Sequence, residues 1–300
     1  MSVELRAPTL DELPALTDLI NRDVEELYGE PEESEESMRL WLTGPSLDPE
    51  TDMRVAVDDG ILRGYVDIDD DPHPIYYVDL RVPPSERDEI REALLDWAEA
   101  RGIDRGAEFL RFHTASIDEP MIRLLEARGY RLIRHFYRMR IDFDGELPEP
   151  RWPEGVTVRT ATRDDAERAY EAHQESFEDH WEHARIPYEQ WEHHMLREGF
   201  DPTLWFLVED DVEFAAVAFC REHEGEKALG WVRVLGVRNN WRRRGLGRAL
   251  LLHCFHEFRR RGFHAAALGV DADSLTGANR LYESVGMRVV RRSDVYEKAK

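Results

Sequence analysis

The second half of this sequence repeats the pattern of the first, and this internal repeat limits the architectures that the chain can adopt. Residues 3–12 match residues 156–165, and further matching segments follow in the same order. Equivalent residues lie 153 positions apart at Arg6 and Arg159, 155 apart at Leu80 and Leu235, and 157 apart at Leu124 and Leu281. An offset that stays this constant predicts one structural unit of about 150 residues that occurs twice.

A proline-rich segment separates the two halves. Residues 143–155 contain three prolines, two glycines and several acids, a composition that is typical of a linker. We therefore expect a first domain over residues 1–143, a linker over residues 144–155 and a second domain over residues 156–300.

Each half is expected to contain both strands and helices. In the second half, the residue pattern predicts strands near 156–159, 204–209, 213–221, 229–237, 265–270 and 287–297, and helices near 163–178, 188–198, 245–261 and 275–285. Strands that follow one another directly, with helices before and after them, indicate an α+β domain with a mixed sheet.

The chain is strongly acidic, with 63 Asp and Glu against 40 Lys and Arg and a formal net charge of −23. Phosphates would be repelled at long range, so a general nucleic-acid or membrane-surface binder is not expected.

Cys220 and Cys254 lack the spacing of a metal or redox motif, and we expect no bound metal. The N-terminus lacks a signal-peptide pattern and no apolar run approaches about 20 residues, which predicts a soluble, cytoplasmic protein.

Against this acidic background, positive charge is concentrated in one short segment. Residues 238–262 carry eight arginines and one glutamate, a net charge of +7. The segment begins as a turn after an apolar strand, includes Arg242, Gly245 and Gly247, and continues as an amphipathic helix. The glycines let a ligand approach the backbone, and the N–H groups at a helix N-terminus favour an anion. The pattern therefore predicts a phosphate-binding loop, although it is neither a Walker loop nor a dinucleotide fingerprint.

The motif Arg-x-x-Gly-x-Gly after a strand ending in Leu-Gly-Val resembles the acetyl-coenzyme A loop of the GCN5-related N-acetyltransferase (GNAT) superfamily. Residues 269–287 resemble the last strand and helix of that superfamily, including its Leu-Tyr-Glu-x-x-Gly-Met ending. The tandem arrangement is similar to that of mycothiol synthase and its actinobacterial relatives. The resemblance covers the second half well and the first half in outline. It implies two tandem GNAT-type domains, each with a mixed, mostly antiparallel sheet flanked by helices.

The resemblance also implies an activity and a set of site residues. The second half would bind acetyl-CoA as a co-substrate and move its acetyl group to an amine by direct transfer in a ternary complex. Leu235 and Val237 would offer backbone groups to the pantetheine arm, and Ser274 stands where many relatives carry an asparagine that touches acetyl-CoA. The pyrophosphate would be held, mainly through backbone N–H groups, by Arg242, Arg243, Arg244, Gly245, Gly247 and Arg248. Tyr282 matches the tyrosine that resembles a general acid, and a phenol of pKa ~10 can protonate a leaving thiolate.

The sequence indicates the residues that would bind the amine acceptor less clearly than those that would bind acetyl-CoA. An ammonium must lose a proton before it attacks a thioester, so a carboxylate, a histidine or an ordered water is expected nearby. Residues 178–183 fall where the GNAT fold lines its acceptor cleft, and Glu178, Asp179 and His180 are the candidate bases. A solvated acidic helix end is the alternative interpretation of this segment. Mycothiol synthase has a glutamate where this chain has Trp231, which argues against the mycothiol precursor as the acceptor; small amines, amino sugars, peptide N-termini and lysines stay open.

The first half lacks these features. Residues 83–89 include two prolines, which have no N–H group, and three acids that would repel phosphate. Leu125 stands at the position of Tyr282. We therefore expect the first half to be a degenerate, non-catalytic GNAT-like domain that packs on the second domain and shapes the acceptor cleft.

Other functions and assemblies are left open by the sequence. A non-catalytic acyl-CoA sensor or partner-binding module could use the same glycine loop, although Tyr282 argues for catalysis. A nucleic-acid protein that uses Arg242, Arg243 and Arg244 is disfavoured by the net charge. Because a duplicated unit can imitate a dimer within one chain, the sequence is compatible with a monomer and leaves a dimer open.

Overall fold

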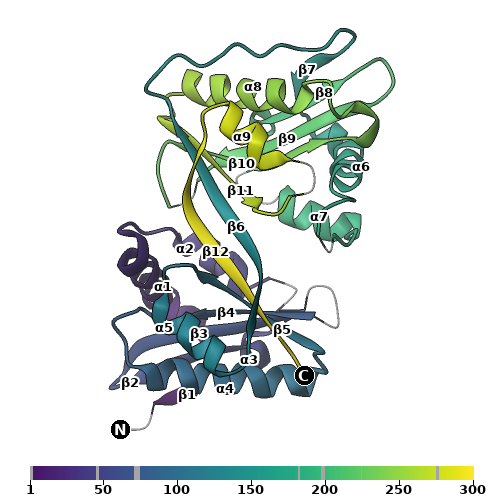
Figure 1. The fold of residues 1–300 in the computed structure, drawn as a ribbon. Coiled ribbons are helices and arrows are strands. Elements are labelled where there is room, and N and C mark those ends of the chain that lie inside the picture. Colours follow the sequence, from purple (N-terminus) through teal and green to yellow (C-terminus); the bar gives the residue numbers. More distant parts are fainter. Residues whose placement is uncertain are drawn as a thin grey trace. The chain divides into compact units, whose positions relative to one another are not determined.

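The chain folds into two compact units, which are described separately (Figure 1). The computed structural model describes residues 3–44, 47–70, 75–181, 183–196, 200–223, 225–274 and 277–300. The first unit contains the chain as far as Phe136 together with residues 225–226 and 292–300. The second unit contains residues 137–223 and 227–291.

The first unit is a mostly antiparallel sheet with the strand order β1-β2-β3-β4-β5-β12. Its strands are β1 (Glu4–Arg6), β2 (Met53–Asp58), β3 (Ile61–Asp70), β4 (Ile75–Arg81), β5 (Phe109–Ala115) and the last part of β12 (Arg288–Ala299). Its helices are α1 (Leu13–Tyr28), α2 (Glu35–Leu42), α3 (Pro49–Asp52), α4 (Asp88–Arg105) and α5 (Glu119–Ala127). The β4–β5 pair is parallel, and the other pairs given by the register are antiparallel.

The second unit repeats this arrangement, with the strand order β6-β11-β10-β9-β8-β7. Its strands are the last part of β6 (Arg131–Asp142), β7 (Thr157–Thr160), β8 (Trp205–Glu209), β9 (Phe214–Glu222), β10 (Leu229–Val237) and β11 (Ala265–Asp271). Its helices are α6 (Ala166–Ser176), α7 (Tyr188–Met195), α8 (Leu246–Arg260) and α9 (Ala278–Ser284). As in the first unit, one central pair, β10–β11, is parallel and its other registered neighbours are antiparallel. The predicted fold class of two mixed, mostly antiparallel sheets with flanking helices is confirmed.

The two units exchange their last strands. Residues Ser293–Ala299 of β12 pair with β5 in the first unit, where Tyr296 is buried in the core. In return, Met139 and Ile141 of β6 are buried in the core of the second unit. Each sheet is thus completed by the last strand of the other half, and the predicted domain boundaries at residues 143 and 156 stay a prediction.

The segment predicted as a linker packs against the second unit. Leu147 and Trp152 lie against its core, and the Arg259 side chain of α8 donates to the carbonyl oxygen of Gly145 at 2.7 Å. The proline-rich composition therefore corresponds to a segment without regular secondary structure. Its apolar side chains nevertheless pack against the second unit beside α8.

Matching helix starts in the two halves support the duplication. In the first half, Arg6 donates to Glu12 and the Thr9 backbone N–H donates to the same carboxylate at 3.1 Å. In the second half, Arg159 donates to Asp165, and Thr162 N–H donates to that carboxylate at 2.8 Å. Both are capping boxes held by an arginine from the first strand, at the offset of 153 residues that the sequence shows.

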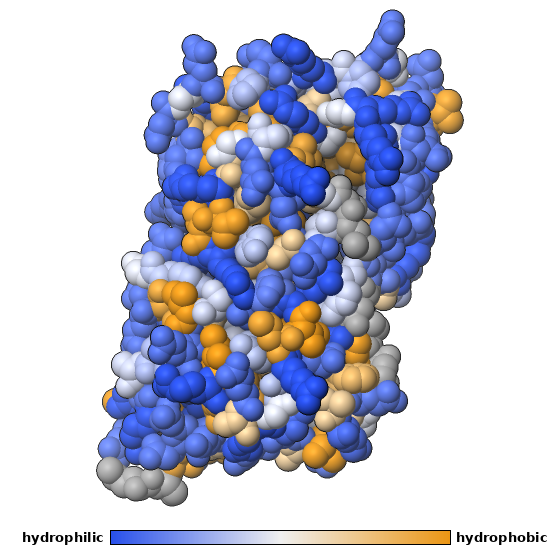
Figure 2. All heavy atoms as spheres, viewed as in Figure 1, coloured by the Kyte–Doolittle hydropathy of each residue, from blue (hydrophilic) through white to orange (hydrophobic). Residues whose placement is uncertain are grey.

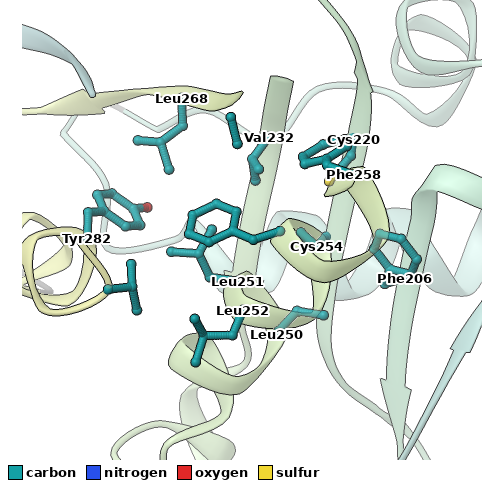
Figure 3. Packing of buried hydrophobic residues seen from close by; sticks show 14 of the residues in the cluster. Phe206, Cys220, Val232, Leu250, Leu251, Leu252, Cys254, Phe258, Leu268 and Tyr282 are labelled. Atoms are coloured by element: carbon teal, nitrogen blue, oxygen red, sulfur yellow. The ribbon is translucent and has the colours of Figure 1, made fainter. Parts of the chain in front are cut away.

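The core of the second unit forms around α8 (Figure 3). Leu250, Leu251, Cys254 and Phe258 are buried on one side of this helix, at helical spacing, and pack against strand residues such as Val232. On the visible outer face, hydrophilic residues dominate and hydrophobic ones occur in small separate groups (Figure 2). Burial of this apolar stripe fixes α8, and with it the loop at its N-terminus.

Candidate active site

The parallel strands β10 and β11 separate partway along their length. Their register runs from Leu229 opposite Ala265 to Trp231 opposite Ala267 and then stops, whereas β10 continues to Val237 paired with β9. A register shift between Val232 and Val234 bends β10 at this point. The edge of β10 that faces β11 can therefore offer backbone donors and acceptors to an extended ligand along this stretch, which contains the predicted residues Leu235 and Val237.

The loop after β10 presents N–H groups at the start of α8. Arg243 and Gly245 both have positive φ, 63° and 84°, so the loop turns tightly into the helix. Within the described residues, the backbone N–H groups of Arg243, Arg244 and Gly245 donate to no backbone acceptor. With the positive end of the dipole of α8, they form a cradle for phosphate oxygens. Gly247 fits close to α9, since a Cβ there would lie 3.3 Å from Leu281.

The arginines of the loop have different roles. Arg242 is held by Asp179, with which it forms an ion pair, and by the carbonyl oxygens of Val237 and Ser176 at 3.2 and 3.0 Å. It therefore ties the loop to the end of α6, and the phosphate contact predicted for it stays a prediction. Arg243 and Arg244 are exposed, and Arg244 lies over the Trp241 ring. These two and the half-buried Arg248 are the loop arginines placed for an anion.

Tyr282 is buried in α9 at the edge of the same core. Its side chain is 8% exposed, and its ring extends from α9 toward Leu268 and Leu251 (Figure 3). Burial raises the pKa of Tyr282 to about 12, so the phenol is protonated at neutral pH. A protonated hydroxyl in a nearly dry environment can give a proton to a thiolate that forms beside it.

The turn after β11 is fixed by a residue that sequence analysis did not select. Asn279 donates to the carbonyl oxygens of Asp271 and Ala272 at 3.3 and 2.8 Å. Ser274 lies in this turn and is half-buried. The neighbouring Leu275 and Thr276 of the sequence motif lie outside the described residues.

On the acceptor side, the structure brings one candidate base close to other imidazoles. Glu178, Asp179 and His180 all follow α6 and are exposed, and Glu182 lies outside the described residues. The His180 ring packs on Phe177 at 4.2 Å between centroids. Burial, with the charges of His183 and Arg242, lowers the pKa of His180 below its usual range. Asp179 is engaged by Arg242, which leaves Glu178 and His180 as the candidates to accept a proton.

Two more histidines belong to this region: His183, which lies in the segment predicted to line the acceptor cleft, and His173, which sequence analysis missed. His173 lies on α6, where its Nδ1 accepts a hydrogen bond from the Trp191 indole at 2.9 Å. Burial, with the charge of His183, lowers the pKa of His173 to about 4. His183 has a buried Nε2 without a hydrogen-bond partner in the described part of the chain. Nothing in the helical pattern of the sequence distinguishes His173 from a packing residue.

The corresponding loop of the first unit has no cradle. The Ser85 N–H donates to Glu26 and the Glu86 N–H donates to Pro83, so these donors are already used. The buried Arg91 guanidinium is turned inward and donates to the carbonyl oxygens of Val82 and Pro83. Carboxylates and carbonyls thus occupy the place where the second unit presents free N–H groups.

The comparisons with known proteins agree with this geometry. The model of the acetyltransferase (GNAT) family matches residues 166–287, the span that contains the loop and Tyr282. Mycothiol acetyltransferase of Streptomyces coelicolor is 31% identical over 254 residues, which are 84% of this chain and 81% of that protein. This chain belongs to the GNAT family of acetyltransferases. Acetyl transfer is therefore its activity, and members of the family use acetyl-CoA as donor.

Solved structures support the tandem arrangement. A GNAT protein from Sphaerobacter thermophilus is 31% identical, with a TM-score of 0.83, over 99% of this chain and 95% of that one. A tandem GNAT protein from the clavulanic acid biosynthesis pathway shares the fold at 16% identity, with a TM-score of 0.74, over 99% and 98% of the two chains. The predicted tandem GNAT architecture of this acetyltransferase is thus confirmed.

Two features are absent from the part of the chain that the structure describes. None of its helices combines the length and apolarity that a membrane span requires. Among the same residues, no three His, Cys, Asp or Glu side chains are grouped so that they could hold a metal ion.

Proposed function

We propose that the second unit of this acetyltransferase binds acetyl-CoA and transfers its acetyl group directly to an amine within a ternary complex. The observation that carries the proposal is the separation of β10 from β11, which leads into the N–H cradle at the start of α8. The free edge of β10 suits the amide groups of the pantetheine arm, and the cradle suits the pyrophosphate. The thioester would then lie between the strands, near Tyr282.

In the reaction that this geometry supports, the neutral amine attacks the thioester carbonyl carbon and forms a C–N bond. As the tetrahedral intermediate collapses, the C–S bond breaks and the sulfur takes the phenolic proton of Tyr282. The amine loses its extra proton to His180, directly or through a water. Direct transfer in a ternary complex needs no acyl-enzyme on a cysteine. This agrees with the burial of Cys220 and Cys254 in the core, where neither thiol is exposed to a substrate.

Consumption of acetyl-CoA tests the proposal. Purified protein is incubated with acetyl-CoA and a panel of small primary amines, and a thiol-reactive dye reports the coenzyme A released. We expect amine-dependent thiol release. Binding of acetyl-CoA without turnover on any amine, peptide N-termini and lysine side chains included, would instead favour the acyl-CoA sensor.

The assignment of His180 as base predicts a pH effect. Because the pKa of His180 lies below the usual 6.5, more than half of the imidazole is neutral at pH 6.5, and the protonated share grows as the pH falls. We expect kcat/KM of wild type, divided by that of His180→Gln, to be about 10-fold or more and nearly constant above about pH 7.5, and to fall toward one as the pH drops below the pKa of His180. The ratio cancels the ionisation of the amine itself.

Asp179→Asn is the matched control for this series. It removes a carboxylate whose charge raises the pKa of His180, and it weakens the anchor of Arg242. It should therefore lower kcat/KM and move the fall in the pH profile to lower pH, while the fall itself remains. If the ratio for His180→Gln does not depend on pH, while that for Asp179→Asn or Glu178→Gln does, His180 is not the base.

A further inference from the structure

One face of the sheet in the first unit carries charged side chains that the proposed reaction does not use. Along β4, Tyr76, Val78 and Leu80 are buried in the core, whereas the alternate residues Asp79 and Arg81 point to the other face. The register of β3 and β4 sets Asp67 directly opposite Asp79 and Tyr65 opposite Arg81. Two carboxylates that face each other across strands disfavour the sheet unless a cation lies near them.

Two helices add carboxylates to this face. Asp23 of α1 is 4% exposed, and one of its oxygens lies 3.8 Å from the Arg81 guanidinium. Asp118, also 4% exposed, accepts a hydrogen bond from the backbone of Met121 at the start of α5. We call Asp23, Asp67, Asp79, Asp118 and Arg81 the aspartate cluster. Arg81 is the one guanidinium of the cluster, and its Nε donates to Asp79 at 2.6 Å. The charge of Arg91 on α4 opposes the rise in the pKa of Asp23 and Asp118.

The buried carboxylates of the cluster differ in how many hydrogen-bond donors they have. One oxygen of Asp67 accepts hydrogen bonds from the Tyr65 hydroxyl at 2.7 Å and from the Trp41 indole at 2.8 Å. The Oδ1 atom of Asp23, by contrast, is buried and has no hydrogen-bond partner among the described residues. Burial raises the pKa of Asp23 to about 7 and that of Asp67 well above its usual range. A buried acceptor without a donor is rare in a native protein and indicates a missing partner.

The cluster is open to solvent at a free strand edge. The register of β4 with β5 stops at Val78 opposite Phe112, so the backbone of Asp79 to Arg81 is no longer paired on that side. The side chains of Asp79 and Arg81 each remain 35% exposed, which gives a small molecule access from water. The separation of β4 from β5 corresponds to that of β10 from β11 in the second unit. In the second unit, this position is where the reacting groups would be held.

We propose that the first unit binds a small organic cation, a primary ammonium, at the aspartate cluster. An ammonium brings three N–H donors, one of which would satisfy Asp23 while the others reach Asp79 and the free edge of β4. A metal ion fits less well, because no three ligating side chains converge there within the described part of the chain. An anion fits poorly, because it brings further acceptors and no donor to the unpartnered Oδ1 atom of Asp23. This binding site is separate from the acetyl transfer proposed for the second unit.

Calorimetric titration of the full chain with 1,4-diaminobutane at pH 7.5 and low salt tests this site. We expect saturable binding to wild type, and at least about tenfold weaker binding to Asp23→Asn and to Asp79→Asn. The neutral isostere 1,4-butanediol should not bind. Glu119→Gln is the matched control: it removes an 82% exposed acid from the same unit, and its affinity should equal that of wild type.

A second variant distinguishes diamine binding at this site from binding at the acceptor side of the second unit. Glu178→Gln should keep the diamine affinity of wild type, whether or not the chain transfers acetyl groups. Asp79 is partly exposed, so Asp79→Asn gives a folded variant even if Asp23→Asn does not fold. The proposal is overturned if wild type shows no saturable binding, if Asp79→Asn binds as well as wild type, or if binding is lost in Glu178→Gln.

Discussion

Tyr282→Phe is expected to lower kcat about 100-fold or more while leaving the Kd for acetyl-CoA within about twofold of wild type. The substitution removes only the hydroxyl from a side chain that is 8% exposed, so the packing of α9 on the core is kept. Without a proton donor, the thiolate must leave as an anion, and breakage of the C–S bond becomes slow. Steady-state kinetics with saturating amine, together with calorimetric titration of acetyl-CoA, measure the two quantities.

Tyr130→Phe is the matched control for this variant. Tyr130 is a buried tyrosine of the first unit that packs on Phe112, and its hydroxyl has no hydrogen-bond partner among the described residues. Its loss should leave kcat unchanged. Parallel loss of acetyl-CoA affinity and kcat in Tyr282→Phe would show that Tyr282 supports the fold of the site and does not supply the proton.

Gly245→Val is expected to weaken acetyl-CoA binding about tenfold or more. Gly245 has φ of 84°, a conformation that costs a residue with a Cβ about 1–2 kcal/mol, and more when the side chain is β-branched. The loop relieves this strain if its backbone leaves the left-handed region, and the N–H groups before α8 then turn away from the pyrophosphate. Titration calorimetry with acetyl-CoA measures the loss.

The other end of α8 offers a control with the same strain. Gly262 has φ of 87°, and at both glycines a Cβ would have no neighbour within 4 Å. Gly262→Val should therefore lower the melting temperature about as much as Gly245→Val, yet leave acetyl-CoA affinity unchanged. Equal loss of affinity in both variants would mean that strain in α8, and not the loop, limits binding.

The sequence allowed the part of the site that depends on local pattern to be predicted. The glycines and arginines of residues 242–248 are contiguous, and their conformation follows from glycine chemistry and the start of a helix. Tyr282 could be located because it stands in a short motif at fixed spacing. The duplication was visible because matching residues, such as Arg6 and Arg159, recur in the same order at a nearly constant offset.

Contacts between distant segments could not be predicted in this way. The bond from Trp191 to His173 and the pair formed by Arg242 and Asp179 depend on how α6 packs on its neighbours, and no local pattern encodes that packing. The exchange of β12 into the first unit depends on which sheet edge offers free hydrogen-bonding groups. The residues of the aspartate cluster come from α1, β3, β4 and the start of α5, which are distant in the sequence. Nothing in the sequence distinguishes its four aspartates from acids exposed to solvent.

The most direct test of the account is the stoichiometry of acetyl-CoA binding to the full chain. The fold occurs twice, but among the described residues the N–H cradle is found at the start of α8 in the second unit. In the corresponding loop of the first unit, the N–H groups of Ser85 and Glu86 already donate to Glu26 and Pro83. Calorimetric titration should therefore give one molecule of acetyl-CoA per chain, with affinity that Gly245→Val weakens. Two molecules per chain, or no binding at millimolar acetyl-CoA, would contradict it.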